Sequence, residues 1–166
     1  MTIIRFASTD NHHPNGITLI ELVVVMALIA ILAAITYPTY VNQTRKSQRA
    51  VAKSVLLNAA NRQEQYFFDN RQYADAMNKL TGYTSAATPT ILFNKNSELT
   101  TTTTDALYAV SVAAVDAAAC GTAPCFKLQA VPQNDQANDD CGTFTITSSN
   151  IHDVSNTSGA TASECW

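Results

Sequence analysis

The sequence has few charged residues and no recognisable catalytic motif. Only 14% of its 166 residues are charged, and the formal net charge is −3. A chain with this balance has no broad electrostatic attraction for nucleic acids or anionic membranes. It also has no glycine-rich phosphate loop, no metal-binding triad and no Ser/His/Asp combination beyond chance. The sequence therefore predicts no enzyme activity, no cofactor and no metal site.

Cysteine is missing from the first two thirds of the chain. The four cysteines, Cys120, Cys125, Cys141 and Cys165, all lie in the last third. An even number of cysteines in a polar region behind an apolar segment indicates disulfides and a compartment outside the cytosol. Free or metal-binding thiols are the alternative, but no histidine stands at zinc-like spacing beside them.

An apolar run from Ile17 to Ile35 contains one charged residue, Glu21. The run is about as long as a helix needs to be to cross a bilayer. A carboxylate inside such a helix costs roughly 2.5–3.5 kcal/mol, so it usually has a partner and a function. Residues 1–16 are short and polar, and we interpret them as a targeting leader. Signal cleavage after Ala33-Ala34 is the alternative.

The helix is predicted to continue beyond the apolar run to about Phe68. Pro38 should remove a backbone hydrogen bond and kink it. From there on, Lys46, Lys53 and Glu64 fall on one side of the helix. At about 100° per residue, the opposite stripe is apolar and needs a surface to pack against. Its members are Val41, Ala52, Val55, Leu56, Ala59 and Tyr66.

Three later segments alternate apolar and polar residues with a period of two. They lie in Leu107–Val115, Phe126–Ala130 and Phe144–Ile146. This period predicts an antiparallel meander of at least three short strands that covers the apolar stripe of the helix. The Thr100–Thr104 run is expected to be a surface loop or a strand edge. The predicted fold class is thus α+β, with a long N-terminal helix packed on a small antiparallel sheet.

Two polar clusters leave alternatives open. Arg45, Lys46, Arg49 and Lys53 are compatible with phosphate or DNA contact, but also with a solvated helix face or salt bridges between subunits. The acidic segment 134–140, with Asn134-Asp135 and Asp139-Asp140, offers oxygen ligands for Ca²⁺. Its spacing does not fit an EF-hand loop, so a polar turn is the preferred interpretation.

The motif GITLIEL over residues 16–22, followed by apolar residues and Pro38, resembles the leader and stem of type IV pilins. The C-terminal part, FKLQAVPQNDQANDDCGTFTI…ECW, is similar to minor pilins of the PilE type. The resemblance implies the type IV pilin fold, with a leader at 1–16, an apolar transmembrane or filament-core helix at 17–36, its amphipathic half at 37–68 and a globular region at 69–166. Asn15 departs from the basic residue common before the cleavage site, and Ile17 departs from the usual Phe.

The resemblance also implies how the protein is processed and what it contacts. A prepilin peptidase/N-methyltransferase would cleave after Gly16 and methylate the new amine of Ile17. Glu21 would complement the N-terminal amine of a neighbouring pilin, and Pro38 would bend or melt during assembly. Partners would be other pilins, through the N-terminal helix, and an inner-membrane assembly platform. Nucleic acid would be reached only indirectly.

The expected function is therefore that of a minor structural subunit of a type IVa pilus. Such a subunit contributes to assembly or initiation, and hence to twitching motility, adhesion or DNA uptake. It would sit in the inner membrane as a single-pass protein with a periplasmic head, then in the extracellular pilus. A pseudopilin of a type II secretion system is the alternative. We expect the disulfides Cys120–Cys125, across a turn, and Cys141–Cys165, which resembles the disulfide-bounded C-terminal loop of the family.

Overall fold

The structure, a computed structural model, describes residues 16–84, 86–115, 124–156 and 158–166. The chain divides into two compact units, and the boundary lies between Tyr40 and Val41. The elements follow in the order α1 (Leu19–Asn70), η1 (Met77–Lys79), β1 (Ile91–Phe93), β2 (Leu99–Thr100), β3 (Tyr108–Ala113), β4 (Lys127–Pro132), η2 (Asn134–Asn138), β5 (Thr143–Thr147), β6 (His152–Ser155) and α3 (Ala162–Cys165).

The first unit contains the N-terminal part of α1, which is apolar on all sides. At its start the backbone N–H of Glu21 donates to Thr18 Oγ1 (3.3 Å). The helix continues through Pro38, whose ring nitrogen has no proton to donate. On either side of it, the hydroxyls of Thr36 and Thr39 donate to carbonyls four residues earlier, at distances of 2.9 and 3.3 Å.

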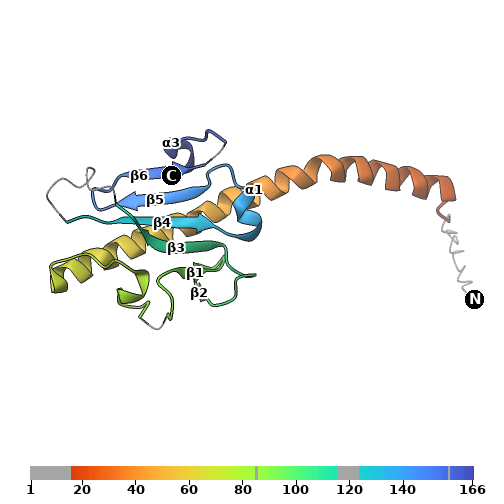
Figure 1. Cartoon of the computed structure of the whole chain (residues 1–166). Helices are drawn as coiled ribbons and strands as arrows, with labels where there is room; N and C mark the ends of the chain where they lie inside the picture. Colours follow the sequence, from red (N-terminus) through yellow and green to blue (C-terminus); the bar gives the residue numbers. More distant parts are fainter. Residues whose placement is uncertain (1–15, 85, 116–123, 157) are drawn as a thin grey trace, which may run out of the picture. The chain divides into compact units, whose positions relative to one another are not determined.

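The second unit begins with the amphipathic part of α1, and the predicted apolar stripe is largely confirmed. Val55, Leu56 and Ala59 are buried, whereas Val41 and Tyr66 at the two ends of the stripe are only partly buried. Figure 1 shows this part of α1 running behind the strands of the sheet. The helix thus supplies the apolar surface on which the sheet packs.

The sheet has six antiparallel strands in the order β2-β1-β3-β4-β5-β6 (Figure 1). The three predicted strands are confirmed as β3, β4 and β5, which form its centre. Their register places Val110 opposite Ala130, and Ala130 opposite Phe144. All three side chains are buried, so one face of the sheet meets the helix. Strands β1, β2 and β6 were not predicted.

Gln63, a buried polar residue of α1, joins the helix to the segment that follows it. Its Nε2 donates to the carbonyl of Ala74 and its Oε1 accepts from the N–H of Ala74, both at 2.9 Å. The side chain is completely buried. These two hydrogen bonds give partners to the backbone N–H and carbonyl of Ala74, which lies in an irregular segment and not in a strand.

The C-terminal region is fastened by the disulfide Cys141–Cys165. In the short helix α3, Thr161 and Glu164 form a capping box. Trp166 then packs in an edge-to-face contact with Phe144 and stacks on the ring of His152, with centroids 5.7 and 4.2 Å away. These contacts fix the end of the described chain against β5 and β6.

Candidate functional site

The residues predicted to guide processing and assembly lie at the start of α1. Gly16 has open space around it, and Ile17 has 77% of its surface exposed. Glu21 lies in the first helical turn with an exposed side chain. The three residues thus lie at an accessible end of the helix, and their roles remain predictions.

The part of α1 up to Tyr40 exposes a continuous apolar surface. Within this part of the chain, side chains such as Leu19, Ile29 and Ile35 are more than half exposed. By length and composition alone, α1 is the one helix among the described residues that is apolar enough to cross a membrane. An exposed apolar surface of this kind marks a site of contact with a membrane or with other proteins.

Two of the four residues in the basic cluster, Arg45 and Arg49, form ion pairs, and within the described part of the chain the two lysines do not. Arg45 and Arg49, one helical turn apart, form ion pairs with Asp135 and Asp139, each at 2.8 Å. The two acids have the same spacing of four residues and lie in the segment around η2. The interpretation of the cluster as a freely solvated helix face is therefore wrong for both arginines, which form ion pairs within the second compact unit, whereas a contact with DNA or with another subunit stays a prediction.

The two pairs differ in exposure. The side chains of Arg49 and Asp139 are only 12% and 3% exposed, whereas Asp135 is 72% exposed. The hydrogen bond from Arg45 holds the pKa of the Asp135 carboxyl below its usual value. Lys53, by contrast, has no ion-pair partner within the described residues, and it lies partly exposed on α1.

The acidic segment forms ion pairs with α1. Among the described residues there is no group of three His, Cys, Asp or Glu side chains arranged to hold a metal ion. The carboxylates of Asp135 and Asp139 already accept hydrogen bonds from the two arginines. The preferred interpretation of a polar turn agrees with this arrangement, and the turn is fastened to α1.

Of the two predicted disulfides, Cys141–Cys165 is present. The prediction of Cys120–Cys125 lies outside the described residues, because Cys120 does. The present bond closes a loop with a sequence separation of 24 that contains β5 and β6. The disulfide thus closes the C-terminal region on itself. Asp139, two residues before Cys141, forms the ion pair that joins this region to Arg49 of α1.

Sequence reasoning missed Gln136, a buried residue of η2. Its Nε2 donates to the Tyr108 hydroxyl (3.0 Å) and to the Arg45 carbonyl (3.2 Å). Burial raises the pKa of the Tyr108 hydroxyl, which therefore stays protonated. A single buried glutamine in a polar segment gives no periodic signal, so only the packed structure identifies this contact.

Comparison with known proteins gives two matches that meet at Pro38. Residues 38–145 match the family described as type IV minor pilin ComP, DNA uptake sequence receptor. Residues 11–37 match the prokaryotic N-terminal methylation motif. Together they cover the stem and most of the head, and they confirm the predicted relationship to type IV pilins.

Individual relatives are more distant. The type IV major pilin protein PilA of Myxococcus xanthus is 35% identical over 80 residues, which make up 48% of this chain and 34% of that protein. The type IV wide pilus major component PilA4 of Thermus thermophilus is 36% identical over 75 residues, or 45% of this chain and 57% of that protein. The match thus spans well under two thirds of either relative.

A solved structure of a type IV pilin from Shewanella oneidensis is 20% identical, with a TM-score of 0.44, and the alignment covers 74% of this chain and 97% of that one. The ComP match covers more than half of the present chain and includes α1 beyond Pro38 together with the central strands. The chain therefore belongs to the type IV minor pilin ComP family.

Proposed function

We propose that this protein is a minor subunit of a type IV pilus and that it contributes to DNA uptake. The observation that carries the proposal is the exposed apolar part of α1, which lies within the match to the N-terminal methylation motif and has Glu21 in its first turn. The family description, which names a DNA uptake sequence receptor, supports the second part. The role is structural, and it consists of binding to other subunits and to DNA.

Assembly follows from the chemistry of two charges. Cleavage after Gly16 leaves an amine on Ile17, and this amine stays cationic when it is methylated. Buried in an apolar filament core, the amine of one subunit and Glu21 of its neighbour attract each other strongly because the dielectric is low. Removing one partner leaves the other charge buried and uncompensated. The pair therefore fixes the register between subunits more than it adds affinity.

The location follows from the same helix. Before assembly the apolar part of α1 anchors the protein in the inner membrane, with its head in the periplasm. A prepilin peptidase/N-methyltransferase processes it there, and an assembly platform transfers it to the filament, where neighbouring helices replace the lipid. The disulfide Cys141–Cys165 suits this oxidising compartment.

Contact with DNA has to rely on a limited number of cations. The net charge is −3, and Arg45 and Arg49 are occupied by acids of the same chain. Lys46 and Lys53 on α1 remain among the candidates for phosphate contact. A small number of phosphate contacts gives a shallow dependence of binding on salt. We therefore expect the filament to bring the head to DNA and this chain to add a few local contacts.

The test uses Glu21→Gln in the full chain, with Glu64→Gln on the head as a matched control. We expect the Glu21 variant to reach the membrane at wild-type levels but to fall at least about tenfold in sheared pili, because an unpaired buried charge costs several kcal/mol. Mass analysis of the N-terminus reports cleavage and methylation in the same samples. Transformation frequency should fall in parallel, while Glu64→Gln behaves like the wild type.

Two outcomes count against the proposal. Wild-type amounts of the Glu21 variant in sheared pili would remove the assembly role of this carboxylate. A deletion strain with normal pili and normal transformation, but with exoproteins retained in the periplasm, would favour the pseudopilin alternative.

A further inference from the structure

Two tyrosines lie at the end of the apolar part of α1. Tyr37 and Tyr40 are 73% and 69% exposed. They are the only aromatic residues in the sequence from Gly16 to Tyr40. Because they are three positions apart, their side chains are neighbours on the helix surface. Rings that carry a polar group are enriched where a membrane-spanning helix passes from the hydrocarbon into the headgroups. The tyrosines therefore mark one end of the apolar part, and the other end has no such ring.

Pro38, between the two tyrosines, adds a polar backbone group at the same level of the helix. The helix continues through Pro38. Because proline has no N–H, the carbonyl of Ala34, four residues earlier, lacks its usual helical donor. In hydrocarbon such a carbonyl costs several kcal/mol, whereas water reaches it at the level of the headgroups. The backbone from Ala34 to Pro38 is therefore more stable at the boundary of the bilayer than at its centre.

The two threonines beside Pro38 do not need water in the same way. The hydroxyls of Thr36 and Thr39 donate to the carbonyls of Leu32 and Ile35, so they are satisfied within the helix. Among the described residues, the hydroxyl of Tyr37 has no hydrogen-bond partner. The aliphatic surface can thus extend to the last of these residues in lipid, and the phenol is the group at this level that gains most from a polar neighbour.

The length of the helix relates this level to the cleavage point. From Leu19 to Tyr37, α1 rises about 27 Å at 1.5 Å per residue. The hydrocarbon core of a bilayer is about 30 Å thick. With Tyr37 at the periplasmic headgroups, Leu19 lies close to the cytoplasmic boundary. The Gly16–Ile17 bond then lies just outside the hydrocarbon, and Glu21 lies less than one turn inside it.

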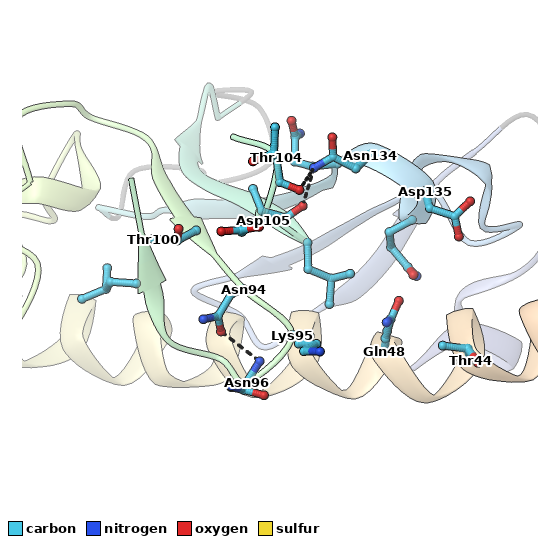
Figure 2. A pocket seen from close by; sticks show the side chains of 15 residues that line it. Thr44, Gln48, Asn94, Lys95, Asn96, Thr100, Thr104, Asp105, Asn134 and Asp135 are labelled. Atoms are coloured by element: carbon cyan, nitrogen blue, oxygen red, sulfur yellow. Dashed lines mark hydrogen bonds between the residues drawn. The ribbon is translucent and has the colours of Figure 1, made fainter. Parts of the chain in front are cut away.

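Polar side chains in the head are used differently. Figure 2 shows a groove beside α1 in which Asn94 Oδ1 accepts from the N–H of Asn96 (2.9 Å) and Asn134 Nδ2 donates to the carbonyl of Thr104 (3.3 Å). These amides hold loops of the head together, so their hydrogen bonds are formed within the chain. The lining of the groove therefore identifies no ligand class, whereas the exposed rings at the end of the apolar part match a lipid headgroup layer.

We propose that Tyr37 and Tyr40 bind the headgroup layer of the periplasmic leaflet and thereby set the depth at which the Gly16–Ile17 bond meets the cytoplasmic leaflet. The rings lie among the ester groups of the lipids, and the Tyr37 hydroxyl donates to an ester or phosphate oxygen. The inference rests on the membrane anchor of the proposed function and adds what fixes its depth. Lipid is the occupant, and not the helix of a neighbouring subunit, because the distance from the tyrosines to the cleavage point matches the hydrocarbon thickness.

The first experiment measures depth in the full chain, reconstituted into vesicles of phosphatidylethanolamine and phosphatidylglycerol. Tryptophan replaces Tyr37 in one variant and Ile29, near the middle of the span, in the other. The lipids carry bromine either near the headgroup or near the ends of the acyl chains. The emission of Trp166, measured in the chain without a reporter, is subtracted. We expect the ratio of shallow to deep quenching to be at least about twofold higher for Tyr37→Trp than for Ile29→Trp.

The second experiment measures cleavage after Gly16 by the prepilin peptidase in the same vesicles, with mass analysis of the N-terminus. Tyr37→Leu combined with Tyr40→Leu lengthens the apolar run, so the helix slides and tilts in the bilayer and draws the bond into the lipid. Cleavage should slow about threefold or more for this reason. Tryptophan at both positions should restore the rate, because it keeps an amphipathic ring at the boundary. Ile29→Leu combined with Leu32→Ile is the matched control.

Three results would overturn the proposal. They are equal quenching ratios at positions 37 and 29, equal cleavage rates of the leucine variant and the control, and a leucine variant that is cleaved normally in vesicles but lost from sheared pili. The third would mean that the tyrosines contact neighbouring subunits. Both vesicle measurements precede assembly, so a failure of the Glu21 test does not affect them. A chain that does not enter the vesicles would contradict this proposal and also the membrane anchor on which it rests.

Discussion

Arg49 on α1 and Asp139 beyond η2 lie 90 positions apart and form a largely buried ion pair. Arg49 Nε lies 3.0 Å from Asp139 Oδ2, and Nη2 lies 2.8 Å from Oδ1. Asp139 Oδ2 also accepts from the N–H of Cys141 (3.3 Å), the residue that forms the disulfide with Cys165. One arginine thereby connects the helix with the covalently closed C-terminal region.

Arg49→Met should destabilise the head because it leaves the Asp139 carboxylate buried without its cation. Breaking a buried pair in this way costs about 3–5 kcal/mol. Chemical denaturation of the full chain, followed by the fluorescence of its single tryptophan, measures the change. Lys46→Met, on the exposed side of the same helix, should change stability by less than about 0.5 kcal/mol. Equal losses in both variants would contradict a specific role for the pair.

The Arg45–Asp135 pair predicts a dependence of stability on pH. Arg45 lowers the pKa of the Asp135 carboxyl in the folded state, so the stabilisation is present above the pKa of the unfolded carboxyl, about 3.9. It is lost as the pH falls through the lowered folded value. We expect wild type and Asp135→Asn to unfold at different denaturant concentrations at pH 7 and to converge well below pH 4. For the control variant Asp69→Asn, we expect no difference from wild type in unfolding that disappears as the pH falls.

Gln63→Leu tests the buried amide beside Ala74. The leucine fits the volume but leaves one backbone N–H and one carbonyl without partners, each at a cost of about 1–3 kcal/mol. The midpoint of thermal unfolding should therefore fall. Hydrogen exchange of the Ala74 amide should accelerate more than that of amides in β4. Unchanged protection at Ala74 would show that another group replaces the glutamine.

Cys165→Ser should loosen the C-terminal region without preventing the central strands from pairing. Closing a loop of this length is worth about 3 kcal/mol in the chain-entropy description. The stacking of Trp166 on His152 should weaken, and the tryptophan emission should shift to longer wavelength. An unchanged emission spectrum would indicate that the aromatic contacts alone hold the chain end.

The sequence predicted those elements whose pattern is long enough to repeat. The apolar stripe around Val55 and Leu56 extends over several helical turns, and the period of two is visible in the strands that contain Val110 and Phe144. Strands β1, β2 and β6 have two to four residues, so no period can be recognised in them. β2 pairs with β1 and β6 with β5, each the strand just before it in the chain, so these strands are defined by their hairpin partners and not by a pattern of their own.

The ion pairs could not be derived from the helix alone. Arg45 and Arg49 looked like a free basic surface because their partners lie 90 residues later. One signal was available: Asp135 and Asp139 have the same spacing of four as the two arginines. Gln136 gave no such signal, since its contacts with Arg45 and Tyr108 exist only in the folded chain.

The position of β6 at the outside of the sheet has a consequence for molecules crowded together at high local concentration. An outer strand with unpaired backbone groups is a template for lateral aggregation, and charged side chains at the edge oppose it. On β6 the exposed Asp153 provides such a charge, and its Oδ1 accepts from the N–H of Val154 (2.8 Å). A second head would have to displace this carboxylate before its own strand could pair there. The aspartate thus helps keep closely packed heads from merging their sheets.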